Sequence, residues 1–246
     1  MNKYYTNNFL IINVYKKNSA KSEVVTQMVY GDTFSIKKKF KKWIKIKIKE
    51  DSYHGYIRNK KFSKYIKPSH KISNLNAVIY KFPNKKKKLG KLTFGSKIKV
   101  TGRKFKFLKF KKGWINQNDV KLLSYKEKNP LKKIKIFNNV KYLWGGKSFK
   151  GIDCSALIQL FLNFNNSYCP RDAKDQVKYF KKNIKLSKIK KNDIIYWKGH
   201  VAVAVSNKNL IHAYGPAKKT VIMNIRKTIQ KIQETTKLQV IKIKRI

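Results

Sequence analysis

The sequence predicts a chain of three units, in which two small all-β barrels precede a domain of mixed helices and strands. Three observations support this prediction. The first half contains an internal repeat of short segments whose apolar and polar residues alternate at period two, as in half-buried strands. That alternation ends after Ser124. The second half then combines an apolar helical pattern, residues 157–162, with two apolar strands joined by a short polar loop.

The internal repeat predicts one barrel in residues 1–67 and a second in residues 75–125. In the first unit VVTQMVYGDTFSI is followed by KKWIKIKI and SYHGYIR, and in the second KLGKLTFGSKIKV is followed by FKFLKF and KKGWINQ. Each unit holds about five short strands in about 55 residues. Strands of this number and length suit a small closed barrel, which leaves few exposed edges. The aligned positions are Gly31 with Gly95, Trp43 with Phe107, and Gly55 with Gly113.

The third domain is expected to span residues 128–246. Asn129 and Pro130 look like a helix start, and apolar residues follow at helical spacing in LKKIKIFNNV. A second helix is predicted to begin at Cys154. The segments HVAVAVS and NLIHAY are separated by a polar loop at residues 206–208, which predicts a β-hairpin.

The chain carries a formal net charge of +50, from 61 lysines and arginines against 11 acids. A basic surface gains affinity for nucleic acids or anionic membranes by displacing counterions. Codon drift toward AT-rich triplets is the alternative, because Lys, Ile, Asn, Phe and Tyr are all abundant. The lysines are spread over the whole chain, and arginine, which matches phosphate geometry better, is scarce. We therefore favour drift and expect no specific nucleic-acid partner.

No segment approaches the roughly 18 to 20 uninterrupted apolar residues of a membrane span. The N-terminal run FLIINVY is short and lacks a small-residue cleavage site, which predicts a strand rather than a signal peptide. We therefore expect a cytoplasmic protein, with export as the alternative. Cys154 and Cys169 are too few for a disulfide framework and lack zinc-ligand spacing. No metal and no cofactor is expected, and the oligomeric state is left open.

Cys154 is the first candidate for a catalytic residue. Apolar residues at helical spacing follow it, so it lies at a helix N-terminus, where unpaired N–H groups and the helix dipole favour an anion. A thiol there is expected to have a pKa below its usual value of about 8.5, which raises the fraction of nucleophilic thiolate. A buried structural cysteine is the alternative, since free cysteines are commonly buried.

Two of the four histidines, His200 and His212, lie on the predicted hairpin downstream of Cys154. A cysteine, a base and a group that orients the base form the arrangement used in nucleophilic catalysis. Both imidazoles share one face of the hairpin only if its loop has an odd length or contains a bulge.

The ordered set YLWGG, GIDCS, PRDA, DIIYW, HV and IHAYG resembles the NlpC family of papain-like cysteine peptidases, which cut cell-wall peptides. The resemblance covers residues 130–246 and implies an α+β domain with helices packed on an antiparallel sheet. Ala156 departs from the glycine that the family commonly has after Asp-Cys-Ser. The two repeat units in turn resemble bacterial SH3-like domains, on a Gly-containing turn, an aromatic strand and a closing Gly-Tyr/Trp-Ile step.

By the first resemblance, Cys154 is the nucleophile, His200 is the general base and later acid, and His212 holds the His200 tautomer. The Tyr142 phenol would help the N–H of Cys154 to stabilise the oxyanion. For Arg171 a structural salt bridge is an open alternative, and Asp153 suits a helix cap better than a catalytic acid. The further substrate-binding candidates that the resemblance implies are Asp153, Ser155, Arg171 and Asp172.

SH3-like domains in front of an NlpC-type domain resemble the γ-D-glutamyl-L-diamino acid endopeptidases. This resemblance implies that the first barrel narrows the cleft and captures the free N-terminal L-alanine of a murein stem peptide. The stretch DSYHGYI supplies Tyr53 as the ligand-facing candidate and Tyr56 as the core-facing alternative, and strand parity leaves open which of the two faces the substrate. We expect cleavage of the γ-D-glutamyl-diamino acid bond during recycling of cell-wall peptides, with the preferred diamino acid left open. The alternatives are an exported endopeptidase or amidase acting on intact wall, and a non-enzymatic binder of polyanions such as nucleic acid or wall polymer.

Overall fold

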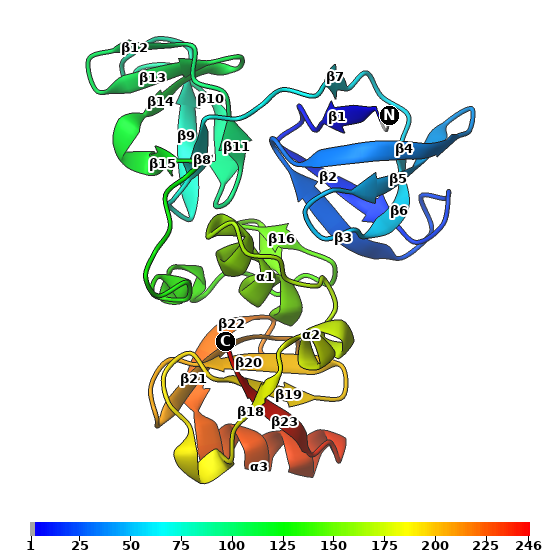
Figure 1. The fold of residues 1–246 in the computed structure, drawn as a ribbon, viewed down its shortest axis with the longest axis vertical. Coiled ribbons are helices and arrows are strands. Elements are labelled where there is room, and N and C mark those ends of the chain that lie inside the picture. The colour runs from blue at the N-terminus through cyan, green and yellow to red at the C-terminus, as the bar shows by residue number, and fades with distance from the viewer. Residues whose placement is uncertain (1–2) are drawn as a thin grey trace.

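The computed structural model describes residues 3–246. The two β-rich units lie side by side at one end of the molecule, and a helix–sheet domain forms the other end (Figure 1). Within the described residues, no helix has the length and apolar character needed to cross a membrane.

The first barrel is a seven-stranded antiparallel sheet with the strand order β3-β2-β6-β5-β4-β1-β7. Its core forms because residues of alternating polarity turn their apolar side chains inward, as in β5, where Ile44, Ile46 and Ile48 are buried and the lysines between them are not. The strands are β1 (Tyr4–Thr6), β2 (Ile11–Tyr15), β3 (Val24–Val29), β4 (Thr33–Lys39), β5 (Trp43–Ile48), β6 (His54–Arg58) and β7 (Ser63–Lys64).

The second barrel divides its strands between two sheets, with the orders β10-β9-β14-β13-β12 and β11-β8-β15. Ile72, Ile79, Leu92 and Ile115 are buried at its centre. Its elements are β8 (His70–Ile72), β9 (Asn76–Tyr80), β10 (Lys88–Thr93), β11 (Lys97–Ile98), β12 (Gly102–Lys104), β13 (Phe107–Phe110), β14 (Gly113–Asn116), the 3-10 helix η1 (Gln117–Asp119) and β15 (Val120–Leu122).

The third domain is built on a six-stranded antiparallel sheet with the order β18-β23-β19-β20-β21-β22. α1 and α3 cover its two faces (Figure 1). Alternate residues of β20 serve the two sides, since Val201 and Val203 pack with α1 while Ala202 and Ala204 pack with α3. The remaining elements are β16 (Lys147–Ser148), β17 (Gly151–Ile152), α1 (Cys154–Phe164), α2 (Ala173–Tyr179), β18 (Lys182–Asn183), η3 (Leu186–Lys188), β19 (Ile194–Trp197), β20 (His200–Ala204), β21 (Asn209–Tyr214), β22 (Lys219–Asn224), α3 (Ile225–Thr236) and β23 (Val240–Arg245). The predicted α+β class is confirmed.

The prediction that a helix begins at Asn129 and Pro130 is wrong. Residues 130–133 form turns, and only the short 3-10 helix η2 (Ile134–Phe137) follows. Leu131, Ile134 and Phe137 are the buried residues, and a spacing of three places side chains on one side of a 3-10 helix, which has three residues per turn. The same apolar pattern therefore fits the tighter helix, which sequence spacing alone did not separate from an α-helix.

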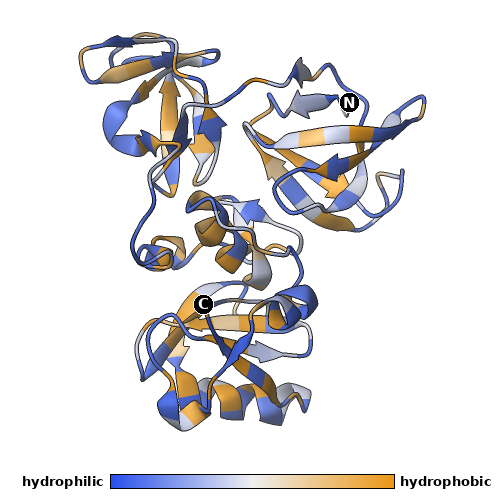
Figure 2. Ribbon diagram, viewed as in Figure 1, coloured by the Kyte–Doolittle hydropathy of each residue, from blue (hydrophilic) through white to orange (hydrophobic). Residues whose placement is uncertain are grey.

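α1 is the central helix of the molecule. It is apolar on almost every side, as its predominantly orange colour shows (Figure 2), because it lies between the sheet and the barrels. Asp153 caps its N-terminus by accepting a hydrogen bond from the Ala156 N–H at 2.8 Å. This cap fixes the position at which the helix begins, and therefore the position of Cys154.

Buried and half-buried charges join all three units at one point. Asp32 and Glu50 come from the first barrel, Lys97 from the second and Lys147 from the helix–sheet domain. Lys97 lies 2.5 Å from Glu50 and 3.4 Å from Asp32, and Lys147 lies 3.8 Å from Asp32. Burial opposes the charge of Lys97, but Glu50 and Asp32 raise its pKa above the usual range. Each buried charge therefore depends on a neighbouring unit for its partner, which holds the barrels in place.

Candidate active site

Cys154 is the first residue of α1, and its side chain is only 6% exposed. The Asp153 cap holds the turn that begins the helix, so the thiol projects from a fixed backbone. The backbone N–H of Val201, the second residue of β20, lies close enough to the thiol to favour its ionised form. The sulfur therefore lies against the start of β20, next to His200 in the chain.

The expected lowering of the Cys154 pKa is wrong for this structure. Burial raises the pKa of the thiol to about 12, and the nearby Asp153 carboxylate adds to the increase. The backbone N–H groups of Val201 and Ser155 favour the thiolate but do not offset the burial. The helix N-terminus was the correct location, but a desolvated thiol stays protonated at neutral pH until a base removes its proton.

His200 and His212 are brought together by the register of the hairpin. Ala204 pairs with Leu210, so residues 205–209 form an odd-length connection, and residues of the same parity face the same side. His200 Nε2 lies 2.9 Å from His212 Nδ1. The condition that the sequence set for a shared face is therefore met.

The surroundings of the two rings determine their tautomers. His212 Nε2 faces the thioether of Met223 at 3.4 Å, and its ring stacks on Tyr214 with centroids 4.6 Å apart. Burial lowers the pKa of His200 to about 4, and burial together with His200 lowers that of His212 to about 3, so both rings are neutral at pH 7. A proton on His212 Nε2 leaves its Nδ1 free to accept from His200 Nε2–H. His200 Nδ1 is then unprotonated and free to act as a base.

Tyr142 lies in the segment that precedes Cys154 and runs alongside Ile152. Burial raises the pKa of its phenol to about 12, and the proximity of the Cys154 sulfur contributes to the increase. The phenol is therefore protonated near the Cys154 thiol, where it can donate a hydrogen bond.

Arg171 forms a buried network with three partners. Its guanidinium pairs with both carboxylate oxygens of Asp153, donates to Ser155 Oγ at 2.9 Å, and donates to Thr26 Oγ1 in the first barrel at 2.7 Å. Ser155 Oγ in turn donates to Asp153 at 3.2 Å. Arg171 therefore has the salt bridge that was left open as an alternative. The network ties the cap of α1 to the barrel, and its hydrogen bonds are made within the protein.

A cleft of about 350 Å³ opens above Cys154, between the first barrel and the helix–sheet domain. This volume is at the small end of the range for ligand sites. The first barrel can approach the helix–sheet domain so closely because Gly145, with a φ of 71°, leaves room for Val24 O, which would lie 2.3 Å from an added Cβ. The lining residues come from the barrel (Lys16, Glu23, Val25, Tyr53) and from the helix–sheet domain (Trp144, Asp153, Cys154, Ser155, Arg171, Asp172, Ala173, Lys174, Gly199).

Tyr53 and Asp172 meet across this cleft. The Tyr53 hydroxyl donates to the Asp172 carboxylate, at 3.1 Å from Oδ2 and 3.4 Å from Oδ1. Burial raises the Tyr53 pKa above the usual range, and the Asp172 charge adds to the effect, so the phenol remains a donor. Tyr56 lies on another face of the barrel, half-buried beside Lys45 and paired in register with Tyr15. Of the two tyrosines, Tyr53 alone lines the cleft.

Glu23 and Trp144 are among the cleft residues that were not singled out from the sequence. Glu23, just before β3, accepts a hydrogen bond from Trp144 Nε1 at 2.8 Å and pairs with Lys16 at 3.3 Å. Hydrogen bonds from Trp144 and then Lys16 lower the Glu23 pKa, so the carboxylate is ionised at neutral pH. The scarcity of acids was the available signal for Glu23, and the YLWGG motif contained Trp144. Between residues 3 and 246, no group of three or more His, Cys, Asp or Glu side chains is placed to hold a metal ion.

Comparison with known proteins agrees with this geometry. Residues 139–238 match the NlpC/P60 family, and residues 14–62 match the bacterial dipeptidyl-peptidase Sh3 domain. The chain is 24% identical over 233 residues to a gamma-D-glutamyl-L-lysine dipeptidyl-peptidase of Bacillus subtilis (strain 168), covering 84% of this chain and 77% of that protein. It is 36% identical over 72 residues to dipeptidyl-peptidase 6 of Lysinibacillus sphaericus, but this match spans only 29% of the chain and 27% of that protein.

A crystal structure of an NlpC/P60 family protein from Bacillus cereus ATCC 10987 has the same fold. It superposes with a TM-score of 0.83 at 16% identity and covers 98% of this chain and 99% of that one. The domain matches lead to one conclusion: the chain carries an NlpC/P60 domain, preceded by a bacterial dipeptidyl-peptidase SH3 domain.

Proposed function

We propose that the chain hydrolyses the γ-D-glutamyl-diamino acid bond of murein peptides that have a free N-terminal L-alanine, with Cys154 as nucleophile. The observation that carries this proposal is the position of Glu23, Tyr53 and Asp172 in the same small cleft as Cys154. The B. subtilis relative is named for a γ-D-glutamyl-L-lysine bond, which supports the same bond class.

Two carboxylates of the cleft, Glu23 and Asp172, are the reason for proposing a free amino terminus. The chain has 11 acids against 61 basic residues, yet Glu23 and Asp172 both line this cleft. Two carboxylates attract an ammonium group, and the Tyr53 hydroxyl orients Asp172 toward it. Since the barrel closes this side, a substrate extended beyond its first residue would meet protein. We therefore infer that one residue and its ammonium group fill the space between the barrel and Trp144.

We infer that the start of β20, whose Val201 lies close to Cys154, brings His200 to the thiol for the usual two-step chemistry. His200 Nδ1 accepts the proton of Cys154 as sulfur attacks the glutamyl carbonyl carbon, and its Nε2–H remains bonded to His212. The Tyr142 phenol and the N–H of Cys154 stabilise the oxyanion. The imidazolium then protonates the leaving amine of the diamino acid, and a thioester forms. Water, deprotonated by His200, attacks the thioester and releases the dipeptide and the thiol.

The direct test uses L-Ala-γ-D-Glu-diaminopimelate and its L-lysine analogue, each with a free and an acetylated amino terminus. We expect release of L-Ala-D-Glu from the free peptides, and loss of most activity on acetylation because the ammonium contact is removed. Cys154→Ala should abolish turnover. Absence of dipeptide from the free peptides would contradict the proposed bond. Equal turnover of the acetylated peptides would favour an enzyme that acts on intact wall, where the amino terminus is blocked.

Asp172→Asn separates recognition from chemistry in the same assay. The substitution keeps a similar shape but removes the charge, so KM for the free peptide should rise by about tenfold or more. Turnover of the acetylated peptide should change little, because that substrate has no ammonium group to lose. An equal loss on both substrates would assign Asp172 to chemistry or structure rather than to the amino terminus.

The protonated state of Cys154 gives a second test. With a pKa of about 12, the thiolate fraction rises about tenfold for each pH unit below that value. Alkylation by iodoacetamide in a Cys169→Ala background should therefore accelerate steadily from pH 7 to pH 10, with mass spectrometry as the readout. A rate that is flat over this range would show a thiolate already formed with imidazolium, and would replace proton transfer during attack with a preformed ion pair.

A further inference from the structure

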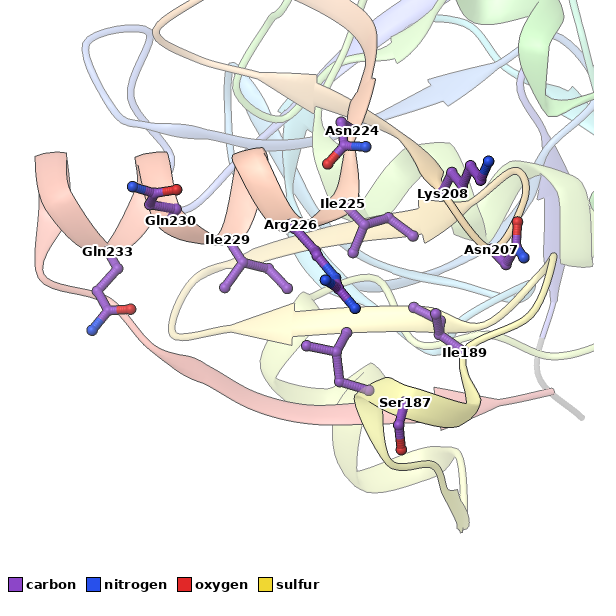
Figure 3. Close-up of a pocket in the computed structure, with 11 residues that line it drawn as sticks. Ser187, Ile189, Asn207, Lys208, Asn224, Ile225, Arg226, Ile229, Gln230 and Gln233 are labelled. Atoms are coloured by element: carbon purple, nitrogen blue, oxygen red, sulfur yellow. The ribbon is translucent and has the colours of Figure 1, made fainter.

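A large pocket lies away from the catalytic cleft. It has a volume of about 850 Å³ and opens between α3 and the segment that contains η3, close to the β20–β21 connection (Figure 3). None of the residues that line the catalytic cleft contributes to it. The family relationship and the proposed peptidase chemistry give this groove no role.

The floor of the groove is aliphatic and its rim is polar. Ile189, Ile225 and Ile229 line it from both sides. The amide side chains Asn207, Asn224, Gln230 and Gln233 surround them. Asn224 Oδ1 caps α3 and Gln230 Nε2 donates to Glu234, while the Asn207 and Gln233 amides offer both a donor and an acceptor, the groups that a peptide backbone presents. Apolar pockets with a few polar groups are typical of binding sites.

Arg226 extends from α3 toward the segment that carries Ser187 and Ile189 (Figure 3). No residue between positions 3 and 246 lies in ion-pair, hydrogen-bonding or ring-stacking contact with its guanidinium. No acid lines the groove, and Lys208 adds a second positive charge at its edge. The groove is thus cationic and aliphatic, with an arginine that has no internal partner.

The rarity of arginine in this chain makes that position informative. Only five arginines occur among 61 basic residues. Arg171 pairs with Asp153, Arg245 with Asp193, and Arg58 stacks over Trp43 at 4.4 Å. In these three places the planar guanidinium makes contacts that lysine does not reproduce. Within the described part of the chain Arg103 also lacks a side-chain partner, but Arg226 differs from it in lining a groove, and a carboxylate is the partner that its planar fork matches.

We propose that this groove binds the C-terminus of a peptide that ends in aliphatic residues. The terminal carboxylate pairs with Arg226, with Lys208 nearby. The aliphatic side chains lie on the three isoleucines, and the rim amides hydrogen-bond to the peptide backbone. A carboxylate, apolar side chains and backbone amides together match each class of group that lines the groove.

The proposal is tested with the full-length protein and the peptide acetyl-Gly-Ser-Val-Ile, prepared with a free carboxylate and as the C-terminal amide. Methyl NMR of isoleucine-labelled protein reports binding directly, because Ile189, Ile225 and Ile229 line the groove. We expect saturable shifts of these methyl groups with the carboxylate peptide, and binding weaker by about tenfold with the amide.

Two variants decide whether Arg226 is the partner. Arg226→Gln should weaken binding of the carboxylate peptide about tenfold and leave binding of the amide peptide unchanged. The matched control is Arg103→Gln, which removes the same charge from an exposed strand of the second barrel, where Arg103 contacts only the backbone oxygen of Phe105. In this control the affinity for both peptides should be unchanged. Peptidase activity should be intact in both variants.

Three results would overturn the proposal. The first is the absence of saturable shifts at the groove isoleucines. The second is an equal loss of affinity in Arg103→Gln, which would mean that the peptide responds to the net charge of +50 and not to the groove. The third is an equal effect of amidation in the wild type and in Arg226→Gln, which would show that the carboxylate is not bound by Arg226.

Discussion

The two barrels use the same turn of their repeat to dock onto different neighbours. Tyr30 precedes Gly31 in the first barrel, and Phe94 precedes Gly95 in the second. Both glycines have a positive φ, of 87° and 78°, so the two turns have the same backbone form. In each case the aromatic ring before the glycine leaves its own barrel and is buried elsewhere.

The destinations of the two rings differ. Tyr30 joins the core of the second barrel, where it packs edge-on against Phe110 with centroids 5.9 Å apart. Phe94 joins the core of the peptidase domain, with centroids 4.6 Å from Phe161 and 4.8 Å from Phe164 on α1. Each unit therefore inserts a ring into the next unit along the chain.

The barrels also differ in what else they contribute. The first barrel reaches the N-terminal end of α1, where Glu23 and Tyr53 line the cleft. The second barrel holds the C-terminal end of the same helix, where the Lys71 ammonium donates to the Phe164 carbonyl. The repeat thus supplies a common docking device, and residues outside its aligned positions give one barrel a part in the site and the other a part in the support of α1.

Among the variants that test this comparison, Phe94→Ala should have the largest effect, and that effect is on stability. The ring is 1% exposed among three other phenylalanines, so its removal should lower the free energy of unfolding by about 3–5 kcal/mol. Chemical denaturation measures the loss. Tyr30→Ala is the matched variant and should cost less, because Tyr30 is 8% exposed and contacts a single ring. An equal loss in both variants would mean that the two docking turns are energetically equivalent.

Glu23→Gln tests whether the first barrel, unlike the second, contributes to substrate binding. KM for the free-amino peptide should rise about tenfold, at the low end for a charged contact because the Glu23 side chain is 40% exposed. The thermal midpoint should not move. Steady-state kinetics provides the measurement, with Glu234→Gln on α3 as a control of the same charge change. A parallel rise of KM in the control would attribute the effect to overall charge.

Much of this architecture was predictable from sequence because its signals are local. Alternating residues such as those of KKWIKIKI specified half-buried strands, and the aligned Gly31 and Gly95 specified repeated turns. The juxtaposition of His200 and His212 followed from the parity of a hairpin, which depends only on the length of its loop.

The rest depended on contacts that a linear pattern does not contain. The pKa of Cys154 is set by burial, which results from the packing of the barrel and β20 around it. Glu23 became a cleft residue only through its contact with Trp144, which lies in a different unit. The 3-10 helix η2 shares its apolar spacing with an α-helix, and its tighter hydrogen bonding was decided by tertiary packing.

Lys71→Met should have the smallest effect on the free energy of unfolding. The variant tests how the second barrel holds α1. Lys71 is 2% exposed and donates to two backbone carbonyls, those of Tyr125 and Phe164, without a carboxylate partner. Replacing it removes the cost of burying a charge but also removes two hydrogen bonds. At pH 7 the two effects oppose each other, so we expect a change in unfolding free energy within about 1 kcal/mol.

The pH dependence of that change gives the sharper test. Burial, and then repulsion from Lys97 and Lys126, lowers the pKa of Lys71 to about 8, from a usual value of about 10.4 in the unfolded chain. Between these values the unfolded chain binds more protons than the folded one, so the stability of the wild type should rise with pH relative to Lys71→Met. Denaturation of both proteins at pH 7 and pH 9.5 measures this difference and cancels the titration of every other group. A difference that is the same at both pH values would mean that the ammonium remains charged in the folded state, and that the carbonyls of Tyr125 and Phe164 stabilise it fully against burial.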